Sequence, residues 1–139
     1  MILGIDLGSK TMGLAISESH IIANNLETFR FENEDYSLCI THLVELNSKY
    51  NFQEIVLGYP KHMNGDVGVR AKISEDFKAL IEKALPGVKV ILEDERLSTN
   101  AVFGVFRQSK TNIKQRKQFK DELSAVVILQ KYLDRRSSF

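Results

Sequence analysis

Acidic residues stand at three places where the sequence passes from a buried apolar segment to a turn or a helix. Asp6 follows an apolar run at residues 1–5, the pair Asp94-Glu95 follows another at residues 88–92, and Asp121 precedes a third at residues 123–133. Carboxylate oxygens suit hard divalent cations such as Mg²⁺ or Mn²⁺. Two such ions can hold the attacking water and the leaving oxygen of a phosphodiester. These positions could therefore form a metal centre if the chain brings them to one edge of a sheet.

Each acidic position also has an ordinary structural explanation. An aspartate such as Asp6 often caps a turn, and the charges of residues 94–96 could pair among themselves in a solvated loop. Asp121 is predicted to open the last helix of the sequence, where the helix dipole alone favours an acidic residue. Glu93 is expected to point to the other side of its strand from Asp94, so it is left out of the site. The three histidines are scattered and show no zinc-binding spacing.

A basic segment leads directly to Asp121. Residues 107–120 contain six basic residues and no acidic one, namely Arg107, Lys110, Lys114, Arg116, Lys117 and Lys120. Such a run is usually a solvated loop. Because this one adjoins a candidate catalytic residue, it is also a candidate surface for the phosphate backbone of a nucleic acid.

The composition is that of one globular domain over residues 1–139. Apolar residues make up 43% of the chain, charged residues 27%, and the net charge is +1, so any nucleic-acid affinity must come from local clusters of basic side chains. The single cysteine, Cys39, excludes an intramolecular disulfide. The amino-terminal sequence does not have the pattern of a signal peptide, and no apolar run reaches the ~20 residues of a membrane span. A cytoplasmic protein is expected.

The apolar pattern predicts an α/β fold. Strands are expected at residues 1–6, 12–17 and 21–31, and their short connections require antiparallel pairing. Helices at 36–50 and 69–81 then alternate with strands at 54–57 and 88–92, which adds parallel strands. A short helix is expected at 98–106 and a final one at 123–133. The prediction is a mixed five-stranded sheet flanked by helices.

Four motifs, in this order, resemble the YqgF/RuvX family, whose members are described as Holliday-junction resolvases and as pre-16S rRNA nucleases. Residues 4–15 (GIDLGSKTMGLA) resemble the first-strand signature of the family, and 56–60 (VLGYP) with 63–65 (MNG) resemble its central loop. Residues 94–99 (DERLST) are similar to its most distinctive motif, and 120–125 (KDELSA) with 128–134 resemble its final helix. Tyr59 and Lys10-Thr11 depart modestly from the commoner forms.

The resemblance implies a ribonuclease-H-like fold and a divalent-metal nuclease that cleaves phosphodiester bonds of pre-16S rRNA or of branched DNA. It implies catalytic residues Asp6, Glu95 and Asp121, with Mg²⁺ or Mn²⁺ bound by Asp6, Asp94, Glu95 and Asp121. The basic residues expected to contact the nucleic acid are Lys10, Arg96, Lys114, Arg116, Lys117 and Lys120.

Two other functions would each account for one of these features. Asp-Leu-Gly at a first-strand turn also occurs in sugar kinases and chaperone-type ATPases, but those proteins enclose the nucleotide between two such domains, and a single domain has no such cleft. A non-catalytic RNA-binding assembly factor would use the basic segment alone. That alternative predicts binding that survives loss of the carboxylates.

Overall fold

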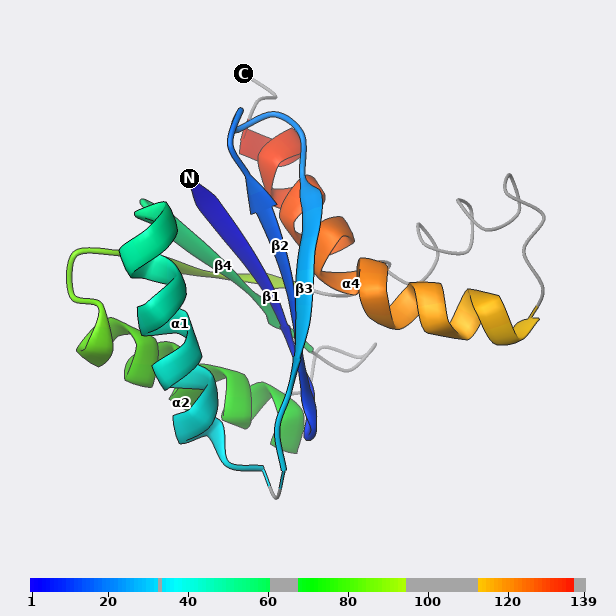
Figure 1. Cartoon of the computed structure of the whole chain (residues 1–139), viewed down its shortest axis with the longest axis horizontal. Helices are drawn as coiled ribbons and strands as arrows, with labels where there is room; N and C mark the ends of the chain where they lie inside the picture. Colours follow the sequence, from blue (N-terminus) through cyan, green and yellow to red (C-terminus); the bar gives the residue numbers. More distant parts are fainter. Residues whose placement is uncertain (33, 61–67, 95–112, 137–139) are drawn as a thin grey trace.

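A mixed five-stranded sheet, with helices on both faces, forms the body of the protein (Figure 1). The computed structural model describes residues 1–32, 34–60, 68–94 and 113–136, and in 113–122 it describes the helix without its side chains. The strands are β1 (Ile2–Leu7), β2 (Thr11–Ser17), β3 (Asn24–Arg30), β4 (Glu54–Tyr59) and β5 (Lys89–Asp94). The helices are α1 (Tyr36–Tyr50), α2 (Val69–Ala84) and α4 (Ile113–Arg136). Within the described ranges, no helix is long and apolar enough to span a membrane.

The order of the strands is β3-β2-β1-β4-β5, with antiparallel pairing from β1 to β3 and parallel pairing from β1 to β5. The predicted antiparallel start with parallel additions is thus confirmed. The β1–β2 turn closes tightly, because the Gly8 N–H donates to the Thr11 carbonyl at 2.7 Å. A Cβ at Gly8 would lie 3.2 Å from that same carbonyl oxygen, so the turn leaves little room for a side chain.

Alternate residues of the buried strands face different helices. On β1, Leu3 and Ile5 belong to the cluster that packs against α1 and α2, whereas Ile2 belongs to the cluster formed with α4. Figure 1 shows the same division, with α1 and α2 on one side of the sheet and α4 on the other. Because both faces of β1 are covered, its sequence is apolar almost throughout.

Helix α4 runs roughly antiparallel to β1. Near its carboxyl end, the Tyr132 hydroxyl donates to Glu54, at the start of β4, at 2.7 Å. One turn earlier, α4 lies so close to Gly4 of β1 that an added Cβ would fall 2.7 Å from the Cβ of Leu129 and 3.1 Å from the carbonyl oxygen of Ala125. The earlier residues of the helix therefore lie toward the carboxyl end of β1, which is where Asp6 stands.

The last helix is longer than predicted. The sequence indicated a start near Leu123, but α4 begins at Ile113, so Asp121 lies inside the helix and the dipole explanation for Asp121 is wrong. Residues 113–120 consist largely of Lys, Arg and Gln, which are good helix formers, and contain no Gly or Pro. The high charge of residues 113–120 predicts a loop, whereas the helix propensity of the same residues favours the helix that is observed. The helix expected at 98–106 lies outside the described residues.

Candidate active site

Asp6 is the second-last residue of β1, just before the β1–β2 turn, and lies on the face of the sheet that carries α4. It is two residues beyond Gly4, which contacts α4, and the neighbouring residues Ile5 and Leu7 point to the opposite face. The Asp6 side chain is partly exposed, and its backbone pairs with Gly13 of β2. A carboxylate in this position adjoins the covered core and still meets solvent, as a cation-binding group requires.

Glu93 and Gly58 continue a row across the sheet that begins at Asp6. Glu93 is paired with Gly58, and one further step of the β1–β4 register, whose last pair is Ile5 with Leu57, places Gly58 beside Asp6. Neighbouring strands are about 4.8 Å apart, so the Cα atoms of Asp6 and Glu93 are about 10 Å apart. The residue between these two carboxylates has no side chain.

Glu93 is buried, with 1% of its surface exposed, and α4 supplies its counter-charge. Arg135 Nη2 lies 2.7 Å from Glu93 Oε2. Among the described residues this oxygen has no partner with hydrogen-bond geometry, so the contact is an ion pair rather than a directed hydrogen bond. Burial raises the pKa of Glu93, while the charges of Arg135 and Lys131 lower it and the charge of Asp94 raises it further.

The sequence-based choice between Glu93 and Asp94 has to be revised. Glu93 was left out because strand alternation points it away from Asp94, but it is Glu93 that shares the face of Asp6. Asp94 is paired with Tyr59, whose hydroxyl donates to Glu75 of α2 at 2.6 Å, so Asp94 belongs to the α2 face. The sequence held no sign of this, because the middle residues of β5 (Val90, Ile91 and Leu92) are apolar on both faces of the strand.

Asp121 lies in α4, four residues before Ala125, which packs against Gly4. Its side chain is not among those described. The same holds for the predicted contacts Lys114, Arg116, Lys117 and Lys120. Glu95 and Arg96, together with the basic residues Arg107 and Lys110, lie outside the described residues altogether. The structure therefore places Asp6 and the backbone of Asp121 near one edge of the sheet, and leaves Glu95 as a prediction.

Two basic residues flank Asp6 at this edge. Arg70, in the first turn of α2, donates from Nη2 to the carbonyl of Leu7 at 3.0 Å and so fixes the residue that follows Asp6. Lys10 is exposed in the β1–β2 turn, and its carbonyl accepts from the N–H of Phe31. The predicted role of Lys10 in substrate binding is compatible with that exposure.

Of the four proposed metal ligands, Asp6 and Asp94 have side chains that the structure describes. Within the described ranges, no three acidic, histidine or cysteine side chains lie close enough together to hold a metal ion. Asp6 alone of the four proposed ligands has a described side chain on the α4 face. Its partly exposed carboxylate is the kind of oxygen donor that Mg²⁺ and Mn²⁺ prefer.

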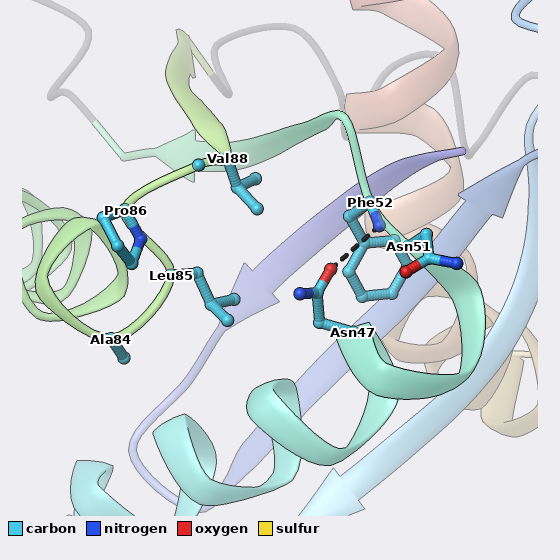
Figure 2. Close-up of a pocket in the computed structure, with 8 residues that line it drawn as sticks. Asn47, Asn51, Phe52, Ala84, Leu85, Pro86 and Val88 are labelled. Carbon is cyan, nitrogen blue, oxygen red and sulfur yellow. Dashed lines mark hydrogen bonds between the residues drawn. The ribbon is translucent and has the colours of Figure 1, made fainter.

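A separate hollow of about 310 Å³ is lined by residues that precede β4 and β5, at the amino ends of these strands (Figure 2). It is lined by Asn47, Asn51, Phe52, Ala84, Leu85, Pro86, Gly87 and Val88. Figure 2 shows Asn47 turned toward the backbone of Phe52, whose N–H donates to Asn47 Oδ1 at 2.9 Å. None of the lining side chains is ionisable, so they offer no group for acid–base chemistry.

Comparisons with known proteins agree with the observed fold and motifs. A family model described as "RuvX: Holliday junction resolvase" matches residues 1–135. A protein from Onion yellows phytoplasma named "Putative pre-16S rRNA nuclease" is 50% identical over 135 residues, which are 95% of this chain and 87% of the relative. A protein of the same name from Staphylococcus aureus is 40% identical over 134 residues, which are 96% of this chain and 94% of the relative.

Among solved structures, T. thermophilus RuvC in complex with a Holliday junction substrate is similar, with a TM-score of 0.61 and 12% identity. The match covers 99% of this chain and 95% of that one. A second Thermus thermophilus RuvC structure gives a TM-score of 0.57 at 13% identity, covering 97% of this chain and 95% of that one. At this identity the likeness concerns the fold, which is ribonuclease-H-like as predicted.

Proposed function

The chain belongs to the RuvX family of Holliday junction resolvases, and from that premise we propose that it is a divalent-metal nuclease that processes the 5′ end of pre-16S rRNA. The observation that carries the proposal is the identity of 40–50%, over at least 95% of this chain, to proteins named as pre-16S rRNA nucleases. Asp6, at the carboxyl end of β1, supplies a carboxylate at the edge where the motif residues of β5 and α4 also stand.

We assign Asp6, Glu95 and Asp121 as the residues that hold Mg²⁺ or Mn²⁺. When bound, such an ion orients the attacking water and offsets the charge of the phosphate. Asp121 lies about one turn of α4 before Ala125, which packs against Gly4 of β1. That placement supports its inclusion. Asp94 is not retained as a ligand, because its strand position belongs to the other face.

The basic residues are assigned to the nucleic-acid backbone. Lys10 lies in the turn after Asp6, Arg96 follows Glu95 in the chain, and the basic residues of α4 precede Asp121. Contacts of this kind position a nucleic acid without reading its sequence. They would hold the scissile phosphate beside the carboxylates.

Branched DNA is the second candidate substrate, because the family is described by Holliday junction resolution. A direct comparison separates the two. Purified protein is incubated with a pre-16S rRNA 5′ fragment, an unrelated single-stranded RNA and a four-way DNA junction, each with Mg²⁺ or Mn²⁺. We expect cleavage of the precursor at a defined position and slower cleavage of the junction. Cleavage of the junction alone would favour resolution, and cleavage of neither would oppose nuclease function.

A further inference from the structure

Two long side chains of α4 hold the carboxyl end of β5. The Lys131 ammonium donates to the main-chain carbonyl of Asp94 at 2.8 Å, and Arg135 forms the ion pair with buried Glu93 at 2.7 Å. We call Glu93, Lys131 and Arg135 the β5 clamp. Its contacts lie on the face of the sheet that carries Asp6.

We propose that the β5 clamp is a positioning device of the active site, one that fixes the end of β5 against α4 and thereby sets the spacing of the carboxylates. The inference rests on the proposed function, in which β1, α4 and the residue that follows β5 in the sequence each contribute a ligand. Asp94 is the last residue of β5, and the next residue in the chain is the proposed ligand Glu95. The helix that provides the clamp also provides Asp121.

The need for such a device follows from the topology. Strand β5 is at the edge of the sheet, so β4 is its only strand neighbour within the described part of the chain. The carboxyl end of an edge strand is free to shift unless another element holds it. Lys131 binds a main-chain atom there, and such a contact constrains the path of the backbone itself.

Stability alone does not account for the clamp. A buried ion pair usually contributes little net stability compared with apolar side chains of similar volume. Helix α4 already packs on the sheet through apolar residues, and its carboxyl end has a second polar attachment, in which Tyr132 and Arg136 contact Glu54 at 2.7 and 2.5 Å. That attachment is at Glu54, the first residue of β4, and so lies at the end of the parallel strands away from Asp6. The β5 clamp differs from the Glu54 attachment chiefly in lying near the proposed site.

The two attachments provide matched variants. Lys131→Met and Glu93→Gln weaken the clamp, whereas Tyr132→Phe and Arg136→Met weaken the attachment at the other edge. For each protein we would measure the free energy of unfolding, Mn²⁺ affinity by calorimetry without substrate, and kcat and KM on the rRNA precursor. Asp6→Asn is included as a variant that lacks a proposed ligand.

We expect Lys131→Met to weaken Mn²⁺ binding about tenfold, as loss of a group that orients metal ligands commonly does. Its kcat should fall while KM stays within about twofold, because the substrate contacts remain. Lys131→Arg keeps a donor for the Asp94 carbonyl and should restore most of the affinity. The two variants at the other edge should bind Mn²⁺ as wild type does, even where they unfold more easily.

Several results would overturn the clamp. One is Mn²⁺ affinity in Lys131→Met equal to that of Tyr132→Phe, while Asp6→Asn still loses binding and cleavage. Another is complete loss of Mn²⁺ binding in Glu93→Gln together with unchanged Mn²⁺ binding in Lys131→Met. That result would make Glu93 a metal ligand. If wild type and Asp6→Asn bind Mn²⁺ equally and neither cleaves, the proposed function fails and the clamp fails with it.

Discussion

Asp6 and Glu93 lie on the same face of the sheet, two strands apart, with Gly58 between them. One of these carboxylates is partly exposed and the other is buried against Arg135. Asp6 can therefore meet a cation from solvent, whereas the charge of Glu93 is already compensated by Arg135. Gly58 itself contributes no side chain between them.

Gly58→Val should impair the site more than the fold. Its side chain would project on the α4 face between Asp6 and Glu93, into space that the proposed metal site needs. We expect Mn²⁺ affinity and the cleavage rate to fall at least about tenfold. Gly87→Val is the control, because a Cβ at Gly87 meets nothing within 4 Å. Unchanged Mn²⁺ affinity in Gly58→Val would show that the row is not part of the site.

Gly4→Ala should destabilise the protein. The new Cβ would fall 2.7 Å from Leu129 Cβ and 3.1 Å from the Ala125 carbonyl, so α4 would have to move away from β1. Overpacking of this kind costs about 1–3 kcal/mol of unfolding free energy. Urea denaturation measures the loss, and a double-mutant cycle with Leu129→Gly, which removes the clashing Cβ, should give a coupling energy that relieves part of it. Two additive mutations would mean that the contact with Leu129 does not set the cost.

Much of the fold followed from apolar periodicity. Residues 36–50 were predicted as a helix from the spacing of their apolar side chains, and α1 spans Tyr36–Tyr50. Short connections also fixed the antiparallel pairing of β1 to β3. The start of α4 was missed because charge was given more weight than helix propensity.

The site was less predictable than the fold. The sequence did not predict that Glu93 shares the face of Asp6. The face that a strand residue occupies depends on the register between β1, β4 and β5, and that register is a tertiary property. In β5, Val90 and Leu92 face one cluster and Ile91 the other, so the sequence offers no polar face from which to read the register. The Arg135 partner of Glu93 is 42 residues away in the chain.

Cys39 should be unreactive in the folded protein. The thiol projects from α1 into the hydrophobic core of the protein. Burial, with a smaller contribution from the charge of Asp35, raises the pKa of this thiol to about 12. At pH 8 the nucleophilic thiolate is therefore scarce, and its fraction rises only as the pH approaches 12. Alkylation by iodoacetamide should be slow in buffer and fast in 8 M urea. Rapid labelling of the native protein at pH 8 would contradict the burial of Cys39.

The basic residues of α4 should contribute to binding through charge. Changing Lys114, Arg116 and Lys117 together to Ala removes three positive charges without introducing a poor helix former. On single-stranded RNA, we expect the slope of log affinity against log salt to fall by up to about 2, equally for two unrelated sequences. Binding would be measured in Ca²⁺ to suppress cleavage. An unchanged slope would return this segment to the explanation of a solvated charged surface.

The most direct test of the account is the cleavage rate of Asp6→Asn on a pre-16S rRNA 5′ fragment with Mn²⁺, compared with wild type and with Asp76→Asn. Asp76 is exposed on α2 and pairs only loosely with Lys72, at 3.6 Å, so it provides a control for loss of an acidic charge. The account predicts that Asp6→Asn loses cleavage by at least about 10²-fold and keeps the melting temperature of the metal-free protein, while Asp76→Asn cleaves as wild type does. Wild-type cleavage by folded Asp6→Asn would contradict it.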